Sequence, residues 1–378
     1  MTTATERDGA DAAGIATTQD TAVTQGSAAA QDTTVAVFGT GYMATRVLRA
    51  GPRYLWCRTP GPAREEGFRP VPGPVAEAHS AWAVPGARIV LGTPARTGAG
   101  GYGTVPTRKA GEVERRYTVG SPYSLGHVLC NHTAAPSQWA ALPALLERTG
   151  EVLRRVHTTF DEPHALDEPP GAARLARWLS GRTVTSAAGR LRREALIRLG
   201  GARLERAAGW CAELGNGTPT GRGGVLLLGG LALGSVIPDP DGAGCSVLAG
   251  EELSTGSPAY DLGWAIGELA EFRLVHFARS GDLDAAGQCA DATDALLRGY
   301  TDAGRPGPPG PALDDVARAA VLRVLAHSLD YTAFVGWTDR LTGHLDVIAA
   351  LLDHPMGTID GLPVTRAGRR TGHKTEEQ

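Results

Sequence analysis

The feature that most constrains the fold is a change in hydrophobic period part-way along the chain. From Val35 to Val119, short runs of β-forming residues are separated by Gly and Pro, a pattern typical of a small, mainly antiparallel sheet. From Trp139 onward, apolar residues recur at helical spacing. The change predicts an α+β protein with two lobes, in which a small antiparallel β N-lobe precedes a mainly helical C-lobe.

The expected elements follow from these two patterns. The sequence predicts strands at 35–38, 45–48, 53–57, 87–92 and 115–120. It predicts helices at 139–156, 172–180, 190–214, 262–278, 284–300, 313–335 and 338–353. Pro143 and Gly150 suggest a break or kink in the first helix, and residues 224–250 form a β insertion within the helical lobe.

Length and composition predict the boundaries of the two lobes and of the terminal segments. A chain of 378 residues suits a two-lobed protein. Residues 1–33 contain almost no large apolar side chain, so we expect them to be disordered. The N-lobe is then expected over 34–122, the C-lobe over 123–357 and a flexible tail over 358–378.

Charge and cysteine content indicate which partners and which cellular compartment to expect. The net charge of −3 gives no reason to expect nucleic acid or an anionic membrane as partner. Five scattered cysteines without a C-x-x-C pair indicate reduced thiols in the cytoplasm. We see no apolar run long enough to span a bilayer and no signal-peptide pattern.

Residues 225–272 carry the most specific motif. They read as a strand, a Gly-rich turn, a second strand and then GSPAYDL at the start of a helix, with Asp261 at a plausible N-capping position. This order resembles the active-site segment of the aminoglycoside phosphotransferase and choline kinase family. In that family a strand leads into HGDxxxxN, a second strand ends in a metal-binding Asp, and GxPxxDL opens a helix. The resemblance covers roughly residues 35–355 and implies a kinase-like fold.

The chemical groups of that motif are replaced in this chain. Leu228 stands where the family has His, Gly230 where it has the catalytic Asp, Ser235 where it has Asn, and Ala249 where it has the metal-binding Asp. Phosphoryl transfer depends on an acid near the acceptor hydroxyl and on oxygen ligands for Mg²⁺. The standard mechanism is therefore not expected, and we predict no metal site and no cofactor.

Three acidic residues remain candidates for an atypical reaction. Glu251 and Glu252 come directly after Ala249, so a small shift of the loop would aim one carboxylate at a metal. The resemblance implies that Asp261 supports the catalytic loop from within, and a plain helix cap is equally compatible. ATP with Mg²⁺ is the expected cofactor only if this atypical chemistry exists.

The N-terminal motif VAVFGTGYMATRVL has two interpretations. Gly39 and Gly41 match the turn of a dinucleotide-binding fold, with Arg58 placed for the 2′-phosphate of NADP. The short distance from Gly41 to Gly51 favours instead a glycine-rich hairpin like that of a phosphotransferase N-lobe. In that second interpretation Cys57 replaces the phosphate-binding lysine, and Arg58, one residue along the strand, points to the other face.

The leading functional prediction is a degenerate kinase-fold protein that acts as a binding or scaffold subunit. The sequence of residues 231–271 also resembles the phosphotransferase-like proteins of class V lanthipeptide and thioamitide biosynthesis. That resemblance implies a precursor peptide and a lyase subunit as partners, in the dehydration of Ser and Thr. The alternatives are an atypical ATP-dependent peptide Ser/Thr kinase and an NADP-binding oxidoreductase.

Overall fold

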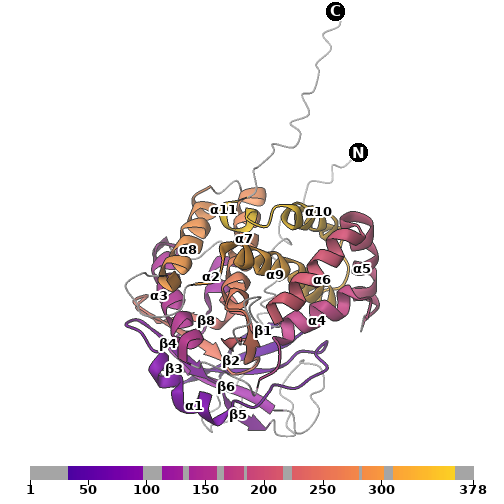
Figure 1. Ribbon diagram of the computed structural model, residues 1–378. Helices are drawn as coiled ribbons and strands as arrows, with labels where there is room; N and C mark the ends of the chain where they lie inside the picture. The colour runs from indigo at the N-terminus through magenta and orange to yellow at the C-terminus, as the bar shows by residue number, and fades with distance from the viewer. Residues whose placement is uncertain are drawn as a thin grey trace, which may run out of the picture.

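The computed structural model shows the two lobes that the sequence predicts (Figure 1). It describes residues 33–96, 113–130, 136–159, 166–182, 185–215, 224–280, 283–301 and 310–361. The predictions of a disordered segment at 1–33 and of a flexible tail at 358–378 lie outside the described residues, apart from Thr33 and residues 358–361. The α+β fold class is confirmed, since an antiparallel sheet forms one lobe and helices form most of the other.

The N-lobe is built on a five-stranded antiparallel sheet. In spatial order its strands are β1 (Thr33–Gly39), β2 (Met43–Ala50), β3 (Arg53–Pro60), β6 (Val113–Val119) and β5 (Thr93–Arg96). The first three strands follow one another in the chain through two short turns, as the Gly-containing breaks predict.

A second, three-stranded sheet joins the two lobes. β4 (Ala87–Leu91) pairs in parallel with β9 (Cys245–Ala249), which also pairs in antiparallel with β8 (Val236–Pro238). The prediction that residues 87–92 belong to the first sheet is therefore wrong. Ala87 and Ile89 of β4 pack into the core of the helical lobe, and that burial sets the pairing.

The remaining strands, β7 (Val225–Leu227) and β10 (Ser254–Gly256), form a small antiparallel pair within the helical lobe. The helices of the described residues begin and end as follows: α1 (Gly73–Ala78), η1 (His79–Trp82), α2 (Leu125–Cys130), α3 (Pro136–Thr159), α4 (Pro170–Leu179), α5 (Ser186–Leu199), α6 (Gly201–Gly215), η2 (Leu233–Ser235), α7 (Ala259–Ser280), α8 (Leu283–Thr301), α9 (Leu313–Phe334), α10 (Arg340–Asp353) and α11 (Gly357–Asp360).

Two details of the helical prediction are corrected. The helix expected over 190–214 is two helices, because Gly200 adopts φ 75°, a conformation that other residues rarely take. Of the break or kink expected at Pro143 and Gly150, the break is absent, since α3 runs through both positions. Gly150 instead lets α8 approach closely, because a side chain there would collide with the backbone of Leu296.

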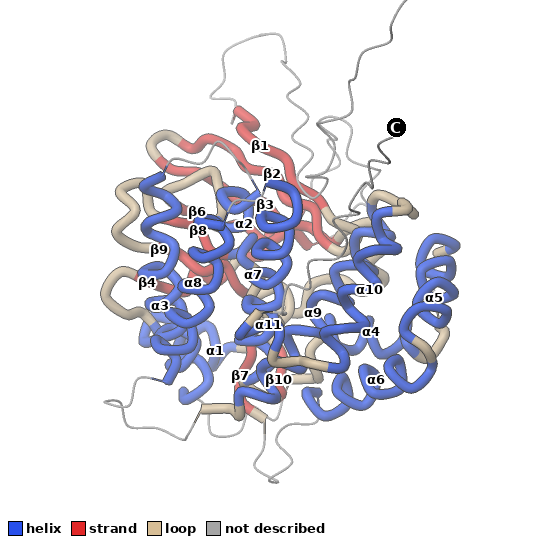
Figure 2. The backbone as a smooth tube through the Cα atoms, turned by 90° about the horizontal axis from the view of Figure 1, so that it is seen from above, coloured by secondary structure: helices blue, strands red, loops and turns tan. Residues whose placement is uncertain are grey.

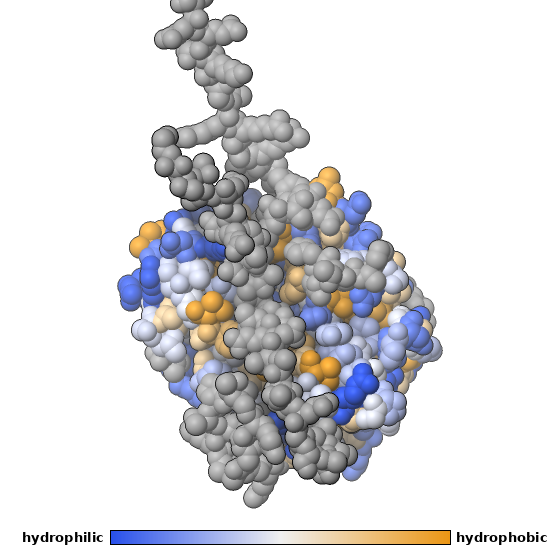
Figure 3. Space-filling model, turned by 180° about the vertical axis from the view of Figure 1, so that it is seen from behind, coloured by the Kyte–Doolittle hydropathy of each residue, from blue (hydrophilic) through white to orange (hydrophobic). Residues whose placement is uncertain are grey.

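Two hydrophobic clusters hold the molecule together. The larger cluster lies among the helices, and seven residues form the smaller one between the lobes: Ala36, Val47, Trp56, Tyr117, Val119, Ile237 and Leu248. Figure 2 shows the strands β1 to β3 on one side, with α4, α5, α6 and α10 gathered on the other. On the face seen in Figure 3, apolar side chains are interspersed with hydrophilic ones. Within the described part of the chain, no helix has the length and apolarity needed to cross a membrane.

Candidate functional site

The loop after β7, where the sequence places the degenerate motif, is held from beneath by Asp261. This residue lies in the first turn of α7 and is fully buried. Its carboxylate accepts hydrogen bonds from the backbone N–H groups of Leu228 and Gly230, both at 2.7 Å. His157 Nε2 lies 3.1 Å from the same carboxylate, and its Nδ1 lies 2.9 Å from the hydroxyl of Tyr300. A chain of hydrogen bonds across α8, α3 and α7 thus fixes the shape of the loop. The position of His157 in the sequence favours a packed histidine at a helix end, and the side chain is indeed buried near the end of α3, but no local pattern marks Tyr300 as its partner.

The position aligned with the catalytic Asp has no room for a side chain. Gly229 and Gly230 adopt φ 93° and 101°, values that strongly favour glycine. A Cβ built at Gly230 would lie 2.8 Å from Cδ1 of Trp264, whose indole covers this part of the loop. An aspartate could enter here only if the backbone and Trp264 both moved. In this arrangement the position of Gly230 offers no carboxylate to the cleft.

Strand β3 presents Arg58, and not Cys57, to the cleft between the lobes. Cys57 lies on the opposite face, where burial and then the charge of Glu114 raise the pKa of its thiol to about 11. Arg58 lies on the same face as Trp56 and lines the cleft with it. The prediction that Arg58 points away from the site is wrong, because the cleft face had been assigned to Cys57 from its place in the motif.

Both terminal nitrogens of Arg58 are engaged by groups of the C-lobe. One of its nitrogens, Nη1, lies 2.9 Å from Glu251 Oε1 and 3.0 Å from Ser235 Oγ, and Nη2 donates to the carbonyl of Gly234 at 2.9 Å. Both side chains of the ion pair are nearly inaccessible, at 4% and 6% exposure. Burial and then the charge of Glu251 raise the pKa of Tyr117 well above its ordinary value. Arg58 of β3 therefore lies next to both Glu251 and Ser235, although it is far from both in the sequence.

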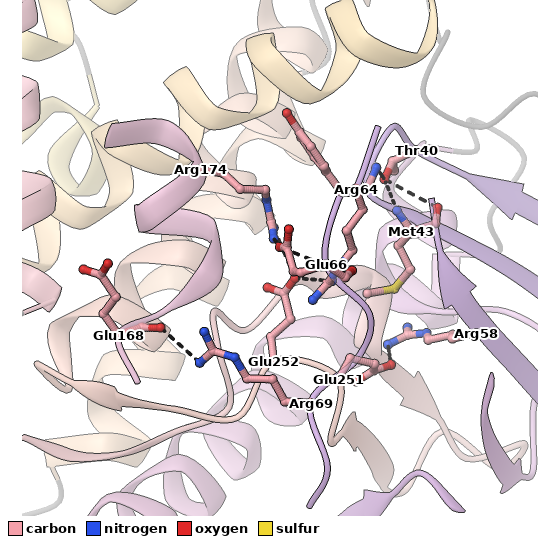
Figure 4. Close-up of polar contacts among 11 residues, drawn as sticks. Thr40, Met43, Arg58, Arg64, Glu66, Arg69, Glu168, Arg174, Glu251 and Glu252 are labelled. Carbon is pink, nitrogen blue, oxygen red and sulfur yellow. Dashed lines mark hydrogen bonds and ion pairs between the residues drawn. The ribbon is translucent and has the colours of Figure 1, made fainter. Parts of the chain in front are cut away.

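Glu252 takes part in a second ionic cluster, which links the segment after β3 to α4 (Figure 4). Its carboxylate contacts Arg64 at 2.5 Å and Arg174 at 3.1 Å, and Arg174 also contacts Glu66 at 2.9 Å. Burial alone would raise the pKa of Glu252, but Arg174 and Arg64 outweigh it and hold that pKa below its ordinary value. The guanidinium of Arg174 stacks 4.7 Å from the ring of Tyr42. This carboxylate is bound to two cations, so it is a poor candidate for a metal ligand.

The glycine motif forms the tip of a hairpin. β1 and β2 pair in antiparallel, with Gly39 opposite Ala44, and the described chain has no helix between them. The dinucleotide-binding interpretation, which needs a crossover helix after Gly41, is therefore wrong. The N–H groups of Tyr42 and Met43 donate to Thr40 Oγ1 at 3.2 and 3.1 Å, and the N–H of Thr40 donates to the carbonyl of Met43. These amides are used within the hairpin itself.

A cavity of about 910 Å³ lies between the lobes. Trp56 and Arg58 line it from the N-lobe, and Trp264, Glu268 and His327 line it from the C-lobe. Its size is within the range of small-molecule and side-chain binding sites. The cavity brings together Gly39, Arg58, Ser235, Glu251 and Glu252 from the predicted residues, whereas Cys57, Ala249 and Asp261 do not line it.

The side chains around the cavity do not fit Mg²⁺ as they are arranged. That ion demands several oxygen ligands in tight octahedral geometry. Ala249 offers no oxygen, Glu251 is paired with Arg58, and the Ser235 hydroxyl accepts a hydrogen bond from the same guanidinium. Among the residues that the structure describes, no group of three or more His, Cys, Asp or Glu side chains is placed to hold a metal.

Comparison with known proteins finds similar structures but no similar sequence family. No protein-family model and no curated protein matches the chain. An aminoglycoside phosphotransferase from Streptomyces rimosus, in complex with ADP and streptomycin, is 16% identical, with a TM-score of 0.36, and the match covers 74% of this chain and 88% of that one. A choline/ethanolamine kinase family protein from Mesorhizobium loti is 16% identical, with a TM-score of 0.41, over 84% and 86% of the two chains.

A glucosamine kinase, in complex with glucosamine, ADP and inorganic phosphate, is 15% identical, with a TM-score of 0.44, over 84% of this chain and 74% of that one. The chain is thus similar to structures of the families that the sequence motif resembles. At this degree of likeness no ligand or activity is carried over from them.

Proposed function

We propose that this chain is a kinase-fold binding protein that does not perform the standard Mg²⁺- and ATP-dependent phosphoryl transfer. The observation that carries the proposal is the buried ion pair between Arg58 and Glu251. Arg58 is a cation that could bind phosphate, and Glu251 is a carboxylate that could bind a metal. In this structure the two are paired with each other. A metal at the carboxylate or a phosphate at the guanidinium would compete with the partner charge in a desolvated place.

Two further contacts support the proposal. Gly230 lies beneath Trp264, so no acid is available at that position to accept a proton from a hydroxyl. The hairpin amides of Thr40, Tyr42 and Met43 are bonded within their own turn, which leaves them unavailable to phosphate oxygens. The hairpin is therefore poorly suited to position a phosphate, and the loop lacks an acid at Gly230 to accept a proton.

The role that we propose is that of a binding or scaffold subunit in the modification of a ribosomally made peptide. Its partners are a precursor peptide and a lyase subunit that dehydrates Ser and Thr. Support comes from the sequence resemblance to the class V lanthipeptide and thioamitide proteins, and from a cavity large enough for peptide side chains. We place the protein in the cytoplasm, which suits five cysteines that are all free thiols.

The test of the proposal measures phosphoryl transfer directly. The full chain is incubated with ATP labelled at the γ-phosphate, Mg²⁺ and a Ser/Thr-containing precursor peptide, with and without a candidate lyase. We expect peptide binding without nucleotide and no label on the peptide. Label transfer by the wild type that is lost in Glu251→Gln but kept in the control Glu66→Gln would overturn the proposal.

One observation favours a second candidate, an atypical peptide Ser/Thr kinase. Arg58, Glu251 and Ser235 meet at one point of the cleft, so a cation, a carboxylate and a hydroxyl are within reach of a single ligand. If this candidate is correct, Mg²⁺ with ATP raises the melting temperature of the wild type, and Glu251→Gln removes the Mg²⁺-dependent part of that rise. The absence of any rise at millimolar ATP counts against it.

A further inference from the structure

Trp56 fills a flat slot between the two lobes. Its side chain is 2% exposed and belongs to the smaller hydrophobic cluster. Ala36 and Val47 of that cluster come from β1 and β2, whereas Ile237 and Leu248 come from β8 and β9 of the other lobe. The indole is therefore enclosed by the N-lobe sheet and by the sheet that joins the lobes.

The indole of Trp56 also makes a hydrogen bond and two aromatic contacts in this slot. Its indole N–H donates to the backbone carbonyl of Ser121 at 3.0 Å, in the connection between β6 and α2 that joins the lobes. The ring of Phe38 stacks on it, with centroids 5.8 Å apart and planes inclined by 24°. The guanidinium of Arg58 lies 6.0 Å from the indole centroid. The ring thus donates to a backbone acceptor while the cation of the cleft lies over its face.

This set of contacts is what a bound purine nucleotide would require. A flat heterocycle stacks on an aromatic ring between apolar side chains, an N–H group finds a carbonyl acceptor, and a guanidinium nearby suits a phosphate. We infer that Trp56 occupies the place of a ligand heterocycle, so that the indole of the protein itself closes the aromatic slot of the cleft to nucleobases. Trp56 is then the residue that determines which ligands the cleft rejects.

A slot closed to nucleobases rests on the proposed function in one respect, since a cleft that rejects the base would not use ATP. The proposed function concerns transfer chemistry at Arg58, Glu251 and Gly230, whereas this inference concerns the slot filled by Trp56. Adenosine separates the two, because it carries a nucleobase and no phosphate. Its binding does not depend on Mg²⁺ or on any transfer step.

The experiment compares adenosine and indole binding, without Mg²⁺, to the wild type, to Trp56→Ala and to Trp178→Ala. Trp178 is a matched control, because it is also 2% exposed and its indole N–H also donates to a backbone carbonyl, that of Ala188, at 3.0 Å. Its side chain is not among those that line the cavity. We expect the wild type to show no adenosine binding at about 1 mM, Trp56→Ala to bind adenosine at least about tenfold more tightly, and Trp178→Ala to gain none.

Two results would overturn the inference. The first is adenosine binding to the wild type as tight as to Trp56→Ala. The second is a Trp56→Ala protein that melts cooperatively and yet gains neither adenosine nor indole binding. If Trp56→Ala does not fold, Trp56→Leu is measured in its place, and the wild-type titration with adenosine still decides the first result. Adenosine binding by the wild type without label transfer leaves the proposed function standing and removes only the inference.

Discussion

Two parts of the site satisfy their polar groups in different ways. One is the frame beneath the loop after β7, formed by Asp261 and His157, and the other is the wall of the cleft, formed by Arg58 and Glu251. In the frame, the carboxylate of Asp261 binds backbone N–H groups of the loop and is itself supported by His157. In the wall, Arg58 and Glu251 bind each other across the gap between the lobes. A side chain that binds backbone sets the shape of a loop, whereas two paired side chains consume the groups that a ligand would use. The difference indicates that the shape of the loop after β7 and the pairing of the cleft charges are set by separate contacts.

Removing the carboxylate of the frame tests the first half of this comparison and has the largest expected effect. Asp261→Ala leaves the buried N–H groups of Leu228 and Gly230 without their acceptor, and should cost about 4 kcal/mol or more of unfolding free energy. Urea denaturation followed by circular dichroism measures it. Asp314→Ala, at an exposed position of α9, is the control and should unfold nearly as the wild type does. Equal midpoints for the two variants would contradict the structural role of Asp261.

Breaking the ion pair of the wall tests the second half. Arg58→Met leaves the carboxylate of Glu251 buried and unpaired, which should cost about 3–5 kcal/mol of unfolding free energy. The double variant Arg58→Met/Glu251→Gln should recover much of that loss, because no uncompensated charge remains. Urea denaturation of the two singles and the double gives the coupling free energy. A double variant that loses the sum of both singles would show that the two side chains act independently.

A smaller effect is expected in the pH dependence of stability, through Glu252. Its pKa in the folded protein is held below the ordinary value of 4.5, so ionised Glu252 stabilises the fold fully above that pH. The contribution is lost as the pH falls below 4.5 toward the lowered pKa of the folded state. Glu252→Gln should therefore flatten the acid limb of a plot of melting temperature against pH. An unchanged slope in the variant would remove the cluster of Arg64, Arg174 and Glu252 as a source of stability.

The sequence predicted the features that depend on local pattern. The two lobes, the glycine hairpin and the helix that starts near Asp261 follow from hydrophobic period and turn residues over short windows. The face on which Arg58 lies was predicted wrongly, since it depends on the pairing of β3 with β2 and β6. The hydrogen bond from Trp56 to Ser121 joins residues 65 positions apart, and no local signal marks it.

The contact of Trp264 with Gly230 also joins residues that are distant in sequence, and no local pattern marks it. The double glycine of the loop was visible in the sequence, but its reason lies in distant groups, the backbone of Glu252 at Gly229 and the ring of Trp264 at Gly230. Local patterns therefore predicted where the site would be. What its side chains contact depended on packing between segments distant in sequence.

The most direct test of the central claim is equilibrium binding of ATP to the full-length wild type, measured by titration calorimetry with and without Mg²⁺. If Arg58 and Glu251 satisfy each other, ATP binds no more tightly with Mg²⁺ than without it, and no label reaches a peptide from γ-labelled ATP. Binding that tightens with Mg²⁺ by about a hundredfold or more, and that Glu251→Gln abolishes, would contradict the account.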